Sequence, residues 1–173
     1  MNVPGRVAPS WRCTAPPGHP TIADRVSSGG VTAISVGVQP AHQGVDLKKN
    51  RENLVGAYVT DAGHLAALVL VDLPLAARLG AALGLAPRSA ADDAIRSSLL
   101  PVQLGENVGE VLNVAASLFN ADGAPHLRLL SVYGGDAPVP ADIAVLAATF
   151  APRVDLELDV SGYGAGGWSV VLA

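Results

Sequence analysis

One short stretch of the chain carries two glutamates, an asparagine and a serine at the spacing of a helix face. Counted along a helix they stand at positions i, i+4, i+7 and i+11: Glu106, Glu110, Asn113 and Ser117. This spacing places all four side chains on one side. No Lys or Arg stands between them, so the face offers acceptors and one amide without a cation of its own. A partner that supplied a cation and a group open to attack by water would complement it.

The other side of the same stretch is apolar, with a stripe of Leu104, Val108, Val111, Ala115, Leu118 and Phe119. This pattern predicts a helix from about Val102 to Phe119 that packs on a core and turns its polar face to solvent. Gly105 and Gly109 each cost such a helix about 1 kcal/mol relative to Ala. They indicate either close packing against a neighbour or a helix that is not well formed.

The elements before this helix are predicted from alternation and turn signals. Val31 to Gln39 alternates as a strand, and two apolar runs around Asp61-Ala-Gly63 predict a hairpin of Leu54–Thr60 and Leu65–Val71 in the middle of a sheet. Asp72 and Pro74 are typical of a helix start, which predicts a helix to about Leu85. Ser89 is expected to cap a second helix that ends before Pro101.

The elements after it are mostly strands. His126 to Tyr133 and Arg153 to Val160 are predicted strands, separated by Gly134-Gly135 and a proline-rich turn. A glycine-rich turn over Ser161–Gly167 then leads into a last strand, Trp168–Leu172. The order of strands, helices and strands predicts an α+β fold, with an antiparallel sheet and two or three helices packed on one face.

Size and composition narrow the class of protein. The chain has 173 residues, of which 50% are hydrophobic and 15% charged, and these values favour one globular domain. We expect a flexible proline-rich tail over residues 1–20 and a single domain over residues 21–173. The formal net charge of −4 argues against nucleic acid as a partner. No apolar run reaches the ~18 residues of a membrane span, and no signal peptide is evident, so a cytoplasmic protein is expected.

Other chemistry-bearing residues predict no further site. Cys13 is the single cysteine, which rules out a disulfide within the chain. The histidines are His19, His42, His64 and His126, and no pair has the i, i+4 spacing of a metal site. No nucleophile elbow surrounds any serine.

From about Asn53 to Ala173 the chain resembles the CheC/CheX family of response-regulator phosphatases. The apolar hairpin running into Asp72-Leu-Pro-Leu-Ala-Ala, the Glu110-x-x-Asn113 motif and the paired terminal strands carry this resemblance. Only one such motif is present, and the helix after the hairpin has neither Glu nor Asn. The chain is therefore more similar to the single-site CheX type than to the two-site CheC type.

The resemblance implies a function in two-component or chemotaxis-type signalling, as a hydrolase that removes phosphate from the aspartyl phosphate of a receiver domain. It implies that Glu110 contacts the regulator's lysine and that Asn113 positions the attacking water. Glu106 and Ser117 share the helix face with them and are expected to be further partner-binding residues. The magnesium ion belongs to the partner, so no metal or cofactor is expected on this chain. A homodimer paired through its sheets is also implied.

Two alternatives stay open beside the phosphatase. The first is the same fold used as an inactive protein-binding module in a signalling complex. The second is an unrelated α+β scaffold whose Glu-x-x-Asn motif is a coincidence, since a lone motif of this kind occurs in many helices.

Overall fold

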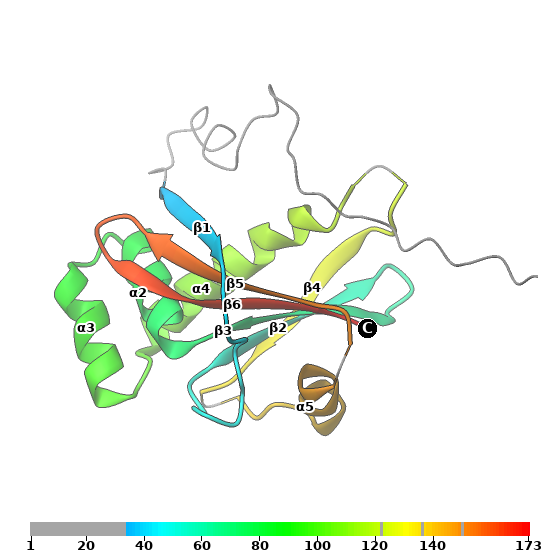
Figure 1. Cartoon of the computed structure of the whole chain (residues 1–173), viewed down its shortest axis with the longest axis horizontal. Helices are drawn as coiled ribbons and strands as arrows, with labels where there is room; N and C mark the ends of the chain where they lie inside the picture. Colours follow the sequence, from blue (N-terminus) through cyan, green and yellow to red (C-terminus); the bar gives the residue numbers. More distant parts are fainter. Residues whose placement is uncertain (1–33, 122, 136, 150) are drawn as a thin grey trace, which may run out of the picture. The chain divides into compact units, whose positions relative to one another are not determined.

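The strands of the computed structural model form one antiparallel sheet. The model describes residues 34–121, 123–135, 137–149 and 151–173, and the strands in them are β1 (Val36–Pro40), β2 (Leu54–Thr60), β3 (Leu65–Val71), β4 (Leu127–Tyr133), β5 (Arg153–Val160) and β6 (Gly164–Leu172). Their order across the sheet is β1-β5-β6-β3-β2-β4 (Figure 1). The predicted hairpin is confirmed as β2 and β3, and β3 lies in the interior of the sheet.

The helices in the described residues are α2 (Leu73–Leu83), α3 (Arg88–Ser97), α4 (Val102–Ala115), the short 3-10 helix η1 (Ala116–Leu118) and α5 (Ala141–Ala148). The α2 and α4 helices pack on one face of the sheet, and α3 packs on α2. The α+β class and the helices on one face are thus confirmed. The α5 helix was not predicted, and it covers the opposite face.

Alternation along β3 explains how one strand serves both faces. Val69 and Val71 are buried among residues of α2 and α4, while Leu68 and Leu70 are buried among residues of α5. Successive side chains of a strand point to opposite faces, so an unbroken apolar run is what a strand covered on both sides requires.

The junction between β3 and α2 is held by side-chain caps. The Asp72 carboxylate accepts a hydrogen bond from the Leu75 N–H at 2.8 Å, as predicted, and a second from the Gly167 N–H of β6 at 2.8 Å. The buried Asn53 side chain accepts another from the Leu73 N–H at 2.9 Å. The bonds from Leu73 and Leu75 satisfy N–H groups that the first turn of a helix leaves unpaired, and the bond from Gly167 ties the cap to β6.

The glycine-rich segment is mostly strand, where a turn was predicted up to Gly167. β6 begins at Gly164, and only residues 161–163 form the turn. The reason is close packing, because a Cβ on Gly166 would lie 2.6 Å from the Leu75 nitrogen. The glycines therefore let the start of α2 rest directly on β6.

The predicted N-terminal cap of α3 is wrong. Ser89 does not cap α3, because that helix starts at Arg88 with Pro87 in the capping position. The tail predicted over residues 1–20 and positions 31–33 of the first strand lie outside the described residues. Within the part of the chain that the model describes, no helix is long and apolar enough to span a membrane.

Candidate functional site

The predicted polar face of α4 is open to solvent. The four residues that the spacing brought together, Glu106, Glu110, Asn113 and Ser117, are all exposed. Glu110 and Asn113 lie one helical turn apart on this face, with Leu112 buried behind them and Val111 partly buried. The predicted geometry of the face is confirmed. The roles of the four side chains remain a prediction.

The opposite side of α4 is fixed to the core and to α2. Leu104, Val108, Leu112 and Ala115 are buried. Gly80 of α2 lies directly against the backbone of Leu104, and the Asn107 side chain donates a hydrogen bond to the Gly80 carbonyl at 2.8 Å. This close contact determines which side of α4 is left free.

A buried tyrosine holds the backbone next to Asn113. The Tyr58 hydroxyl, from β2, donates to the Leu112 carbonyl at 2.6 Å, and its ring packs 5.0 Å from that of Phe119. At this point α4 passes into η1, and the Ala116 N–H turns to the Asn113 carbonyl. Tyr58 therefore supplies the donor that Ala116 would give to Leu112 in an uninterrupted α-helix. Burial raises the pKa of Tyr58 well above its ordinary value, so the hydroxyl keeps its proton and remains a donor.

The start of α4 is anchored by a buried carboxylate. The Glu52 side chain accepts a hydrogen bond from the Leu100 N–H at 3.2 Å, just ahead of the helix, and Arg51 lies 3.4 Å away. A negative charge at the N-terminal end of a helix is favoured by the helix dipole. Neither Glu52 nor Tyr58 was singled out from the sequence, because their partners are 48 and 54 residues distant along the chain.

The electrostatics of the free face are those of an unneutralised pair of carboxylates. No ion pair or side-chain hydrogen bond among the described residues involves Glu106 or Glu110. α4 itself contains no Lys or Arg. The face can therefore accept a cation and hydrogen-bond donors from a partner. The described residues contain no group of three or more His, Cys, Asp or Glu that could hold a metal ion.

The two glycines of α4 have no packing role in the described chain. A Cβ on Gly109 would meet nothing within 4 Å, and one on Gly105 would make ordinary contact with Leu100 at 3.6 Å. The helix nevertheless runs unbroken through both positions. Close packing against a neighbour within the described residues is therefore not the reason for either glycine.

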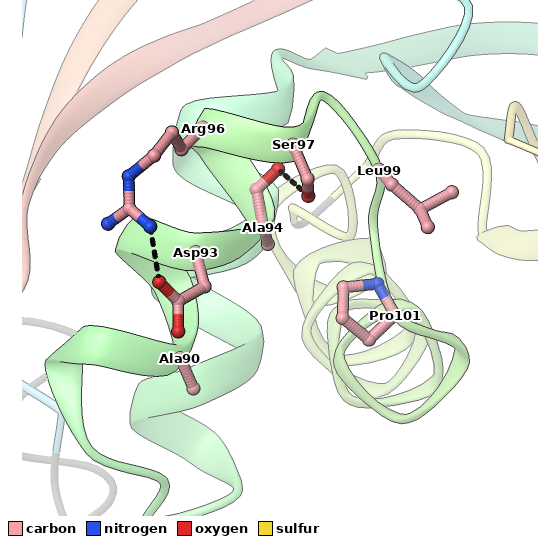
Figure 2. A pocket seen from close by; sticks show the side chains of 7 residues that line it. All are labelled: Ala90, Asp93, Ala94, Arg96, Ser97, Leu99 and Pro101. Atoms are coloured by element: carbon pink, nitrogen blue, oxygen red, sulfur yellow. Dashed lines mark hydrogen bonds and ion pairs between the residues drawn. The ribbon is translucent and has the colours of Figure 1, made fainter.

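A hollow of about 500 Å³ lies away from this face, on α3 and the segment that joins it to α4. Ala90, Ala94, Leu99 and Pro101 line much of it, and Figure 2 shows its charged residues, Asp93 and Arg96, joined to each other. Their ion pair measures 2.7 Å. None of the predicted site residues reaches it, so the candidate site is the α4 surface.

No family model and no curated protein matches the chain. Several solved structures are similar to it. FliY of Thermotoga maritima is 16% identical with a TM-score of 0.45, covering 82% of this chain and 75% of that chain. The FliM middle domain from H. pylori is 10% identical with a TM-score of 0.43, covering 87% and 82%.

A further similar structure is a CheX-CheY-BeF3-Mg+2 complex from Borrelia burgdorferi. The match is 7% identical with a TM-score of 0.39, covering 80% of this chain and 83% of that chain.

Proposed function

We propose that this chain binds the receiver domain of a response regulator through α4 and accelerates hydrolysis of its aspartyl phosphate. One observation carries the proposal: Glu110 and Asn113 stand exposed and one turn apart on the free face of a helix whose other side is anchored. The anchoring of α4 matters because phosphoryl transfer depends on positioning and electrostatics more than on covalent chemistry by the protein.

The residues act through ordinary donor and acceptor chemistry. The Glu110 carboxylate holds the ammonium group of the receiver's lysine. The Asn113 amide oxygen accepts a hydrogen bond from a water molecule and aligns it with the phosphorus atom. Water attacks phosphorus, the bond from phosphorus to the aspartyl oxygen breaks, and the products are the receiver's carboxylate and inorganic phosphate. The receiver's magnesium ion neutralises the charge on the phosphoryl oxygens.

The test measures phosphate release and binding in parallel, on phosphorylated receiver domains from the same organism. Asn113→Ala should abolish the accelerated loss of phosphate while binding survives, because the amide acts mainly in the transition state. Glu110→Ala should also weaken binding, since a hydrogen bond to a charged group contributes about 1.5–3 kcal/mol. Glu106→Ala should do less than either.

Gln103 provides the matched control. It is another exposed carboxamide on α4, ten residues and hence roughly 15 Å from Asn113 along the helix. Gln103→Ala should leave both phosphate release and binding unchanged. If the wild type binds a receiver yet leaves its phosphate lifetime unaltered, the proposed phosphatase activity is wrong. If no receiver binds, the proposed function is wrong altogether.

A second candidate function is a docking module of the same fold that does not hydrolyse phosphate. The observation that favours it is the apolar character of the surface beside the motif, where Val114 and Leu118 are 66% and 54% exposed. Such side chains contribute to binding without taking part in chemistry. The parallel assay separates the two functions.

A further inference from the structure

A ridge of exposed side chains runs along α4 into η1 and changes character halfway. Its members are spaced four residues apart, and all are exposed: Glu106, Glu110, Val114 and Leu118. Residues at this spacing stand one above the other on a helix. The ridge is thus acidic in its N-terminal half and apolar in its C-terminal half, and Asn113 lies beside the boundary.

The apolar half is a continuous uncharged surface. From Val111 to Leu118 the chain carries no charged residue. Val114 and Leu118 lie about one and about two turns beyond Glu110, so about 12 Å of helix holds both the last carboxylate and the two exposed apolar side chains. The Gly109 position, one turn before Asn113, is open, which lets a partner approach the helix backbone closely beside the motif.

We propose, on the basis of the proposed function, that α4 docks the receiver in a single direction. The receiver's lysine lies over the acidic half, at Glu106 and Glu110, and an apolar patch next to that lysine covers Val114 and Leu118. Charge complementarity selects this occupant. The acidic half has no cation of its own, so it can accept the lysine, and the apolar half places no charged side chain against the receiver's apolar patch. The apolar half holds the complex together, while Glu110 and Asn113 orient the reacting groups.

The experiment measures the affinity of receiver domains, phosphorylated with acetyl phosphate, for single-residue variants at several salt concentrations. Val114→Ser and Leu118→Ser should each raise Kd about tenfold, the expected effect of losing one buried aliphatic side chain. The slope of Kd against salt should stay as in the wild type. The double variant Glu106→Ala, Glu110→Ala should instead flatten that slope, because exposed charge pairs are screened by salt.

Val145 supplies the matched control. It is a valine on α5 with 63% exposure, close to the 66% of Val114, and it lies on the helix that covers the opposite face of the sheet. Val145→Ser should leave Kd unchanged. Thermal unfolding of all three serine variants should match the wild type, since each side chain is already largely exposed.

The outcomes separate this inference from the function on which it rests. If the wild type binds and hydrolyses but Val114→Ser and Leu118→Ser behave like Val145→Ser, directional docking is wrong and the phosphatase stands. If the serine variants weaken binding to a receiver whose phosphate lifetime is unaffected, directional docking stands and the chain is a docking module. If no receiver binds the wild type, both are wrong.

Discussion

Two opposed effects act on the pKa of the Asp72 side chain. Its carboxylate caps α2 and bonds to β6 through the N–H groups of Leu75 and Gly167, and these bonds favour the charged form. Burial disfavours it. The burial effect is the larger, and it raises the pKa of Asp72 above its ordinary value despite the two donors and the nearby Arg78 guanidinium.

This shift predicts a pH dependence of stability with a definite sign. A carboxyl whose pKa is raised by folding binds more protons in the folded state, so its contribution is full at low pH and is lost as pH rises through the folded pKa. The free energy of unfolding of the wild type, minus that of Asp72→Asn, should therefore fall between pH 3 and pH 7. Urea titrations across that range measure it. A difference that grows with pH would mean that the two N–H donors outweigh burial.

The exposure and capping role of single residues could be predicted from the sequence where they depend on neighbouring residues in the chain. The exposure of Glu110 and Asn113 follows from spacing within one helix, and the Asp72 cap follows from the residue that precedes an apolar run. Tyr58 and Glu52 anchor the same helix, but nothing near them in the chain indicates it. A buried tyrosine needs some acceptor for its hydroxyl, and only the folded structure identifies that acceptor as the Leu112 carbonyl.

At the scale of elements, α2 and α4 each contain a glycine at which the same substitution should have opposite effects. A Cβ on Gly80 would collide with the Leu104 carbonyl oxygen and lie 2.9 Å from its carbon, whereas one on Gly109 would meet nothing. Gly109→Ala should therefore raise the free energy of unfolding by about 1 kcal/mol, the difference in helix propensity. Gly80→Ala should lower it, because the two helices must separate.

Chemical denaturation of the two variants checks this pair. Gly109→Ala also bears on function, because its added methyl group lies where a partner would approach α4. A variant that gains stability yet loses affinity for the receiver would identify Gly109 as part of the docking surface. Equal destabilisation by both substitutions would contradict the packing described for α2 and α4.

Element boundaries were predicted well where a single signal was present and poorly where two signals competed. The hairpin, α2 and α4 follow from clear periodicity. α5 was missed because Pro138 and Pro140 indicate a turn, although Pro140 is the residue that leads into the helix and Asp142 stands in its first turn. The start of β6 was missed because glycines are typical of turns, and the need for a close approach by α2 is visible only once the layers are assembled.

At the scale of the whole molecule, the described sheet has two edges, β1 and β4. All five residues of β1 are exposed, and Val38 is 64% exposed. An uncovered edge is easily extended by another strand. We therefore keep the homodimer as a prediction and place the pairing at β1.

Light scattering at micromolar concentration tests the assembly. The wild type should have the mass of a dimer, and Val38→Lys should have that of a monomer, because a charge on an edge strand opposes pairing. Val145→Lys, with a similar exposure on α5, should leave the dimer intact. A monomeric wild type would contradict the homodimer. A dimer that persists in Val38→Lys would show that the subunits do not pair at β1.

The position of β6 also bears on how the sheet assembles during folding. β6 stands between β5 and β3, so within the described sheet the β1–β5 pair joins β3, β2 and β4 only through β6. Without Gly164–Leu172, the β1–β5 pair and the β3–β2–β4 ladder share no hydrogen-bonded strand pair. Pairing of β6 with both neighbours is thus the folding step that closes the sheet.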